Sequence, residues 1–246
     1  MRVTVLGATK GMGRALARSL ASRGDKLFLL GRDLDELRRS AEDLDVRAGA
    51  RAVVGVACCD LERPDTFEAA LSAAETALGR TDVVVVSAGL FATQECLEAD
   101  PALTARLLTV NFTNTVLFCE RVRERLLAAG GGTLCVFSSV AGDRGRKPVV
   151  LYGAAKAGLS AYLEGLDHRF HSKGLTVVCV KPGFVKTSMT EGLRPPPFAG
   201  EPDEVAARVL RAIDRSRPVV YAPAIWRLVL FLIKLTPRAV MRRLEI

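Results

Sequence analysis

Residues 2–16 read RVTVLGATKGMGRAL, and this stretch decides the fold. RVTVL (2–6) is an apolar run typical of a buried strand, and the glycine-rich turn GATKGMG (7–13) leads into a pattern with helical spacing. Glycines let a backbone approach a phosphate closely, and a helix N-terminus offers unpaired N–H groups and the positive end of its dipole. A tight turn that is glycine-rich by chance is the alternative. The position between a first strand and a helix is, however, the one that a dinucleotide-binding loop requires.

The rest of the chain repeats this alternation of strand and helix. Six further apolar runs read as strands, and they are nearly continuous in Val, Leu and Ile, as in strands buried on both faces: KLFLL (26–30), AVVGVAC (52–58), DVVVV (82–86), TLCVFS (133–138), LTVVCV (175–180) and PVVYA (218–222). Segments with helical spacing, such as Val205, Val209 and Ile213, lie between them. The pattern predicts an α/β fold, a Rossmann-like doubly wound parallel sheet in one domain over 1–223, followed by a helical tail over 224–246.

Composition narrows the classes of partner. The formal net charge of +8 favours an anionic partner, which would be nucleic acid, acidic lipid or a phosphorylated cofactor. Nucleic acid is not expected as a partner, because the few aromatic residues do not alternate with Lys or Arg runs as base-stacking residues would. Six cysteines without a CxxC pair, and only two histidines, predict reduced thiols and no metal site. Without a signal peptide or about 20 consecutive apolar residues, the chain is expected to be cytoplasmic.

The end of the second predicted strand indicates which dinucleotide is bound. NAD-binding proteins place a carboxylate there, on the ribose 2′-hydroxyl. This sequence has Gly31 followed by Arg32, and Lys10 adds a cation inside the glycine loop. Asp33 is expected to cap the helix that begins DLDELRR. Two cations therefore predict NADP(H), with two solvated surface cations as the alternative.

A tyrosine and a lysine four residues apart form the candidate catalytic pair. Tyr152 and Lys156 would share one face of a helix, and Ser139 lies thirteen residues earlier (152 − 139) at the end of an apolar strand. A free tyrosine has a pKa near ~10. A neighbouring ammonium is expected to lower that pKa and make Tyr152 a proton donor to a carbonyl, with Ser139 holding the same oxygen.

Together these motifs resemble those of the short-chain dehydrogenase/reductase family, to about residue 222. The likeness is carried by GATKGMG (7–13), Asp60, SAG (87–89), Asn111, Ser139, Tyr152, Lys156 and KPGFVKT (181–187). It implies seven parallel strands, a catalytic set of Asn111, Ser139, Tyr152 and Lys156, and a proton relay through a water on Asn111. Leu6 and Ser87 depart from the family pattern, in which threonine and asparagine are usual.

The resemblance also implies which residues hold the cofactor. The phosphates would lie on Gly7, Thr9, Lys10, Gly11, Met12 and Gly13, and the adenosine side would lie along Asp60, Leu61, Ser87, Ala88 and Gly89. The nicotinamide would be seated by Pro182, Gly183, Val185 and Thr187, and its ribose would be held by Lys156 beside Tyr152. Family members commonly form dimers or tetramers through the helices that contain 101–129 and 152–172 here.

The substrate is expected to be recognised by the loops and the tail. The second half of the chain resembles a bacterial subgroup related to the reductase of a decaprenylphosphoryl keto-pentose, which implies a lipid-linked or hydrophobic ketone. Pro237 should divide the tail, WRLVLFLIKLTPRAVMRRL (226–244), into two helical pieces whose apolar face and cations suit an anionic membrane surface. The protein would then lie on the inner face of the cell membrane. A helix over the substrate pocket and a dimer contact are the other possibilities for the tail.

Two alternatives remain for the function of the whole chain. The first is a soluble reductase of a small ketone or a 3-oxoacyl thioester, and the second is a non-catalytic NADP-binding partner.

Overall fold

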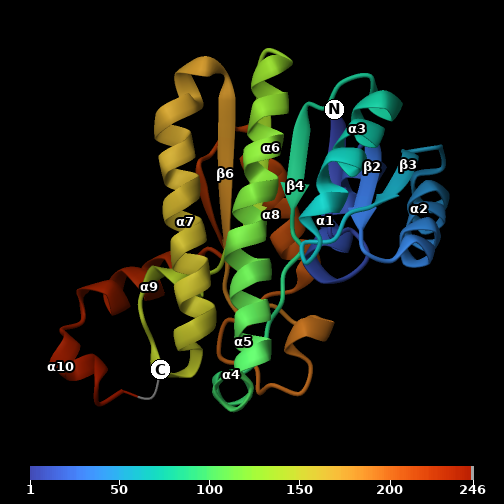
Figure 1. The fold of residues 1–246 in the computed structure, drawn as a ribbon. Coiled ribbons are helices and arrows are strands. Elements are labelled where there is room, and N and C mark those ends of the chain that lie inside the picture. Colours follow the sequence, from blue (N-terminus) through green and yellow to red (C-terminus); the bar gives the residue numbers. More distant parts are fainter. Residues whose placement is uncertain (245–246) are drawn as a thin grey trace.

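Seven parallel strands form one sheet in the order β3-β2-β1-β4-β5-β6-β7 (Figure 1). The structure is a computed structural model that describes residues 1–244. The strands are β1 (Arg2–Leu6), β2 (Lys26–Gly31), β3 (Val53–Cys58), β4 (Val83–Val86), β5 (Gly132–Phe137), β6 (Leu175–Pro182) and β7 (Val219–Ala222). The sheet confirms the predicted fold class, because all seven predicted runs are strands and the order reverses beside β1. The glycine loop follows β1 and therefore lies at this reversal, where open α/β sheets bind ligands.

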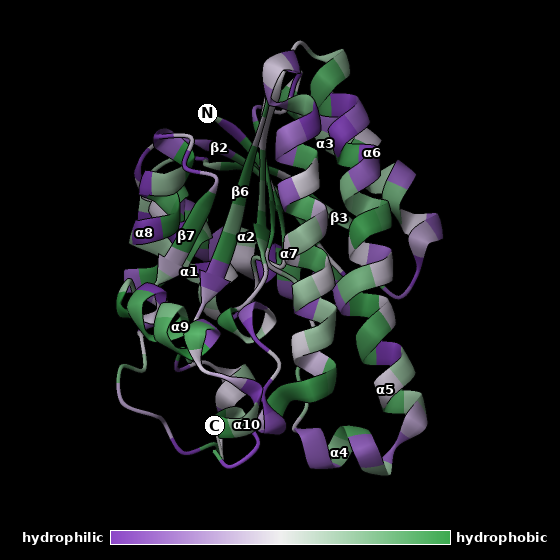
Figure 2. Cartoon of the chain, turned by 90° about the vertical axis from the view of Figure 1, so that its left-hand side faces the viewer, coloured by the Kyte–Doolittle hydropathy of each residue, from purple (hydrophilic) through white to green (hydrophobic). Residues whose placement is uncertain are grey.

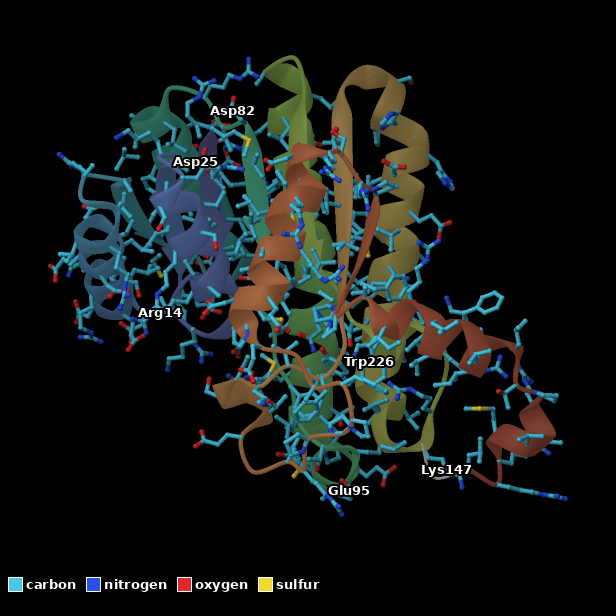
Figure 3. The ribbon with its side chains drawn as sticks, turned by 180° about the vertical axis from the view of Figure 1, so that it is seen from behind. Arg14, Asp25, Asp82, Glu95, Lys147 and Trp226 are labelled. Atoms are coloured by element: carbon cyan, nitrogen blue, oxygen red, sulfur yellow. The ribbon has the colours of Figure 1, made fainter. Side chains whose placement is uncertain are left out.

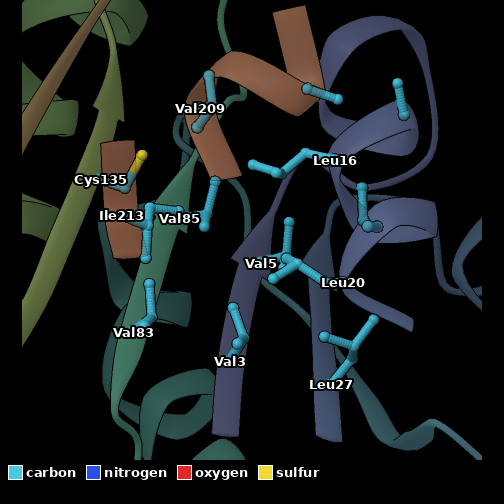
Figure 4. Packing of buried hydrophobic residues seen from close by; sticks show 14 of the residues in the cluster. Val3, Val5, Leu16, Leu20, Leu27, Val83, Val85, Cys135, Val209 and Ile213 are labelled. Atoms are coloured by element: carbon cyan, nitrogen blue, oxygen red, sulfur yellow. The ribbon is translucent and has the colours of Figure 1, made fainter. Parts of the chain in front are cut away.

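Helices cover both faces of the sheet and divide the core into two layers. One layer packs α1 (Gly11–Ser22), α2 (Leu34–Ala48) and α8 (Pro202–Asp214) against the sheet, with Val3 and Val5 pointing toward them (Figure 4). The opposite layer packs α3 (Phe67–Leu78), α6 (Asn114–Ala128) and α7 (Val150–Phe170) against the other face. Successive strand residues point to opposite faces, so burial on both sides requires the nearly continuous apolar runs seen in the sequence.

Shorter elements connect the strands and helices, most of them at the carboxyl ends of the strands. The helices α4 (Gln94–Ala99) and α5 (Pro101–Leu108) precede a π-helical turn at Thr109–Thr113, and 3₁₀ turns occupy Pro64–Thr66, Val140–Asp143, Lys147–Val149, His171–Lys173 and Ser188–Thr190. Between the 3₁₀ turn at Ser188–Thr190 and the start of α8 at Pro202, the chain has no helix or strand. Asp33 caps α2 as predicted, because its Oδ1 accepts hydrogen bonds of 3.0 Å from the N–H groups of Asp35 and Glu36.

The tail consists of α9 (Ile225–Leu235) and α10 (Arg238–Met241), with Pro237 between them as predicted. Helix α9 contacts β7 and the 3₁₀ turn at Val140–Asp143, so the tail begins against the body of the domain. In Figure 2, α9 is a mostly apolar helix at the periphery, beside the carboxyl end of the sheet. No helix in the described part of the chain combines the length and apolarity needed to span a membrane.

Candidate active site

The glycine loop has the shape of a phosphate cradle. Gly7 has a φ of +98°, which is unfavourable for other residues, and a Cβ on Gly13 would lie 2.1 Å from the Gly7 carbonyl oxygen. Lys10, at the N-cap of α1, makes no side-chain hydrogen bond to the first turn, so the N–H groups of that turn lack a side-chain partner. These N–H groups, together with the positive end of the α1 dipole, fit the phosphates of a dinucleotide.

A cleft of about 450 Å³ opens beside this loop, and it gathers many of the residues that the sequence assigned to the cofactor. Those that line it are Gly7, Thr9, Lys10, Arg32, Asp60, Leu61, Ser87, Ala88 and Gly89. Gly11, Met12 and Gly13 do not line this cleft and continue the loop into α1. The second predicted cluster, Pro182, Gly183, Val185 and Thr187, lies outside the cleft, although Thr187 approaches the loop, with its Cγ2 3.3 Å from where a Gly11 Cβ would be.

Ser87 and Glu62 shape the cleft in ways that the sequence did not reveal. The hydroxyl of Ser87 donates to the carbonyl oxygens of Leu6 and Gly7, both at 3.1 Å, and so ties β4 to the start of the loop. Glu62 lines the cleft and forms a two-pronged ion pair with Arg106, at 2.9 and 2.6 Å, while Arg32 lies 3.8 Å from the same carboxylate. Arg32 is therefore held near the cleft by a weak, exposed pair that a phosphate can replace.

The predicted catalytic residues meet at the carboxyl end of β5. Ser139 follows this strand, and Tyr152 and Lys156 come from the first two turns of α7. Nζ of Lys156 donates to the Phe137 carbonyl at 2.9 Å and lies 5.8 Å from the centroid of the Tyr152 ring. Asn111, in the π-helical turn, is fully buried and exchanges hydrogen bonds of 2.8 and 2.6 Å with the main chain of Leu90. A Cβ on Gly89 would lie 3.0 Å from Asn111 Oδ1 and 3.8 Å from Lys156 Nζ, so these two polar groups approach each other across Gly89.

The protonation of Tyr152 corrects the sequence-based expectation. Burial raises the pKa of Tyr152 to about 12, and a hydrogen bond with Ser139 opposes this only in part. The predicted lowering by Lys156 is therefore wrong for this structure, because removing the phenol from water outweighs the ammonium, which is directed at the Phe137 carbonyl. A phenol with this pKa is fully protonated at neutral pH, which is the form that donates a proton.

Lys156 is expected to set the alkaline limit of activity. Burial lowers the pKa of Lys156 from 10.5 to about 8. If the ammonium is required, the rate of ketone reduction should fall about tenfold per pH unit above this pKa, whereas Tyr152 stays protonated. Profiles of kcat/KM over pH 6–10 with Lys156→Arg as comparison would test this, and a flat profile to pH 10 would show that the charge is dispensable.

The same group should affect stability in the opposite sense. Between about pH 8 and 10.5 the unfolded chain keeps the Lys156 proton while the folded chain has lost it. The contribution of Lys156 to the free energy of unfolding therefore rises with pH through this window. If activity falls above about pH 8 while the contribution of Lys156 to the free energy of unfolding rises, the loss of activity comes from titration of Lys156 and not from alkaline unfolding.

The tail closes one side of the Gly183 segment. A Cβ on Gly183 would lie 2.0 Å from Nε1 and 2.3 Å from Cδ1 of Trp226, so the indole occupies the space of a side chain at that position (Figure 3). Nε1 of Trp226 is buried and has no hydrogen-bond acceptor among the described residues. Trp226 thus packs against the segment that the sequence assigned to the nicotinamide.

A buried carboxylate fastens the tail to the loop that follows Ser139. The side chain of Asp143 is only 2% exposed and accepts hydrogen bonds of 2.6 Å from Lys181 Nζ and 2.6 Å from Tyr221 OH, and Lys234 of α9 lies 3.2 Å away. Burial would raise the pKa of Asp143, but the hydrogen bonds and positive charges of its partners hold it below its usual value. Arg144 adds a hydrogen bond of 2.9 Å to the Thr236 carbonyl. None of these partners had a recognisable sequence signal.

Comparisons with known proteins agree with this geometry. The family model described as short chain dehydrogenase matches residues 1–197. An uncharacterized oxidoreductase of Mycobacterium tuberculosis is 34% identical over 244 residues, covering 98% of this chain and 96% of the relative, and carbonyl reductase family member 4 of Xenopus tropicalis is 28% identical over 218 residues, covering 85% and 89%. A short-chain dehydrogenase from Sphingobium yanoikuyae, solved in complex with NADPH, superimposes with a TM-score of 0.81 at 25% identity, over 97% of this chain and 98% of its own. This chain belongs to the short-chain dehydrogenase family.

Proposed function

We propose that this protein is an NADP(H)-dependent reductase that converts a ketone into a secondary alcohol. One observation carries the proposal: a protonated Tyr152 lies with Ser139, Lys156 and Asn111 at the carboxyl edge of the sheet, next to a cleft shaped for a dinucleotide. The names of a carbonyl reductase and of a dehydrogenase solved with NADPH, both relatives of this chain, support the same reaction and cofactor. When bound, the cofactor supplies the hydride that reduces the carbonyl carbon.

The residues of this chain then have distinct tasks. The hydroxyls of Ser139 and Tyr152 orient the carbonyl oxygen, and Tyr152 gives it the proton that completes the alcohol. A charged Lys156 stabilises the phenolate that Tyr152 becomes, which offsets the cost of burying that charge. Asn111 and Lys156, which approach each other across Gly89, are the proposed path by which the proton is replaced.

Lys10 and Arg32 are proposed to select NADPH over NADH. Both line the cleft and are exposed. The double variant Lys10→Gln, Arg32→Gln should weaken NADPH binding by about 10- to 100-fold, since each charge-assisted hydrogen bond to a phosphate contributes roughly 1 kcal/mol at an exposed site. NADH binding should change by less than about twofold, because NADH has no 2′-phosphate.

Fluorescence titration with the two cofactors makes this measurement. Lys26→Gln is the matched control, because Lys26 is an exposed cation at the opposite end of β2. NADH bound as tightly as NADPH by the parent protein would show that the cations do not select the phosphate.

For the substrate, we propose a hydrophobic or lipid-linked ketone, such as a polyprenyl-phosphate keto-sugar, reached at the inner surface of the cell membrane. The support is the outer face of α9, where four large apolar side chains are more than half exposed: Leu228, Phe231, Leu232 and Leu235. Four cations of the tail, Arg227, Arg238, Arg242 and Arg243, make no ion pair with any described residue, whereas Lys234 is paired with Asp143. We also propose that α6 and α7 carry a dimer or tetramer contact, since Leu117 of α6 and Phe112 of the preceding π-helical turn are exposed.

The double variant Phe231→Glu, Leu232→Glu should abolish binding to anionic vesicles. Burying two such side chains contributes about 3 kcal/mol, so vesicle partitioning should fall roughly 100-fold. The variant leaves Trp226 and the Lys234 contact in place, unlike deletion of residues 224–246.

Sedimentation with phosphatidylglycerol vesicles is the readout. Val46→Glu is the control, because Val46 is 81% exposed on α2, away from the tail. If the parent and the double variant sediment equally with the vesicles, the proposal that α9 binds the membrane surface is wrong.

A further inference from the structure

A groove of about 630 Å³ separates the outer side of α7 from the C-terminal helix α10. Its walls come from three parts of the chain: the loop after Ser139, the first two turns of α7, and α10. Figure 3 labels Lys147, which lines the groove on the loop side. Neither Ser139, Tyr152 nor Lys156 lines it, so the groove is separate from the reacting groups.

The charges around this groove have one sign. Five basic side chains line it, and no carboxylate of the described residues does: Arg144, Arg146, Lys147, Arg238 and Arg242. Three of them, Arg146, Arg238 and Arg242, form no ion pair with any residue in 1–244. Arg238 begins α10 and Arg242 directly follows it, so the two lie one turn apart and both reach the groove. The positive charges of Arg146, Arg238 and Arg242 repel one another, and a bound anion would relieve that repulsion.

Arg146 brings to the groove a buried donor without a protein acceptor in residues 1–244. Its Nε is buried and has no hydrogen-bond partner among the described residues. Burial lowers the pKa of this guanidinium, with only Asp143 opposing the effect. A buried donor without an acceptor is unfavourable, and a bound anion would satisfy it. Guanidinium groups match the oxygens of a phosphate in pairs, which makes arginine the preferred residue for this ligand.

The rest of the groove is apolar. Val150, Ala154 and Ala157 form a strip along α7, and Met241 faces it from α10. A free inorganic anion would leave this strip unused. The combination of an arginine cluster and an apolar strip fits a ligand with a charged head and a hydrocarbon chain.

We propose that this groove binds a phosphate ester whose organic part is apolar, with the phosphate on Arg146, Arg238 and Arg242 and the chain along α7. The groove shares a wall with the reaction site, because Ala141 and Gly142 come two and three residues after Ser139 and Gly153 is next to Tyr152. The site is thus a recognition site beside the reacting groups. Its occupation can be measured without turnover.

Isothermal titration calorimetry with octyl phosphate, below its micelle concentration, tests the proposal on the full chain. Octyl glucoside supplies the chain without the charge, and inorganic phosphate supplies the charge without the chain. We expect octyl phosphate to bind at least about tenfold more tightly than either. Arg146→Met with Arg242→Met should weaken it at least about tenfold, since two charge-assisted contacts are lost.

The control is Arg211→Met with Arg227→Met, which removes the same net charge from α8 and α9 outside the groove. Equal affinity for inorganic phosphate, or unchanged affinity in the Arg146 and Arg242 variant, would overturn the proposal. If the double variant is unfolded by circular dichroism, Arg242→Met alone carries the test, because Arg242 is exposed and lies beyond α9. NADPH binding is titrated in parallel. If NADPH does not bind while octyl phosphate does, the proposed reductase function is rejected and the proposal for the groove stands.

Discussion

Replacing Tyr152 with phenylalanine should lower kcat for ketone reduction by about 10²- to 10⁴-fold, the usual contribution of a positioned general acid. The substitution removes one hydroxyl, and with it the only group in the proposed mechanism that gives a proton to the carbonyl oxygen. Because the pKa of Tyr152 is raised to about 12, the proton is present throughout the physiological range and its loss cannot be mimicked by pH. NADPH affinity should change by less than about tenfold, since the glycine loop and cleft are unaltered.

The ring itself should stay in place in this variant. Tyr152 packs edge-on against Phe91, with centroids 5.2 Å apart and an interplanar angle of 82°, and phenylalanine keeps that contact. Tyr162→Phe is the matched control, because Tyr162 lies on the same helix and donates to Glu120 at 2.7 Å, away from Ser139. Stopped-flow measurement of NADPH oxidation compares the two. Full activity in Tyr152→Phe, or full cellular function without activity, would favour a non-catalytic NADP-binding role.

The strand pattern was predictable because the physics that produces it is local. A strand covered by helices on both faces is apolar at nearly every position, so the composition of RVTVL (2–6) and DVVVV (82–86) predicts their burial without information about their neighbours. The glycine loop and the Tyr152–Lys156 spacing are local in the same sense. Boundaries shifted by one or two residues where hydrogen bonding continued past the apolar run, as when β6 extends through Pro182.

The contacts of the tail could not be predicted, because they join residues far apart in the chain. Asp143 receives Lys181, Tyr221 and Lys234 from three different elements, and nothing in the local sequence of any partner marks the pairing. The direction of the Tyr152 shift was missed for a related reason. Two residues on one helix turn reveal a neighbouring charge, but the extent of burial depends on the whole fold.

These contacts change the interpretation of the tail. The sequence left three possibilities for the tail: a helix on a membrane surface, a helix over the substrate pocket and a dimer contact. In the structure Trp226 covers Gly183 and Lys234 reaches Asp143. The tail therefore packs against the body of the domain through Gly183 and Asp143, and only the outer side of α9 stays exposed.

Gly13→Ala should remove NADPH binding almost completely, by about 100-fold or more, and should also lower the free energy of unfolding by about 2 kcal/mol or more. A Cβ at this position would lie 2.1 Å from the Gly7 carbonyl oxygen and 2.3 Å from Ser87 Oγ. The first of these is main chain and cannot rotate away. The loop must therefore move, and the N–H groups proposed to hold the phosphates move with it.

Gly165→Ala is the control, since Gly165 lies in α7 with nothing within 4 Å of the new methyl group. There alanine should stabilise the protein by about 0.5–1 kcal/mol, because it has the higher helix propensity. Urea denaturation measures the stability of both variants, and NADPH titration is done at a temperature where both are folded. Together they distinguish a loss of NADPH binding caused by the moved loop from one caused by unfolding. Adding Ser87→Ala to Gly13→Ala should restore little binding, because the Gly7 carbonyl still obstructs the methyl group. Full restoration would show that the Ser87 hydroxyl, and not the backbone of the loop, sets the requirement for glycine.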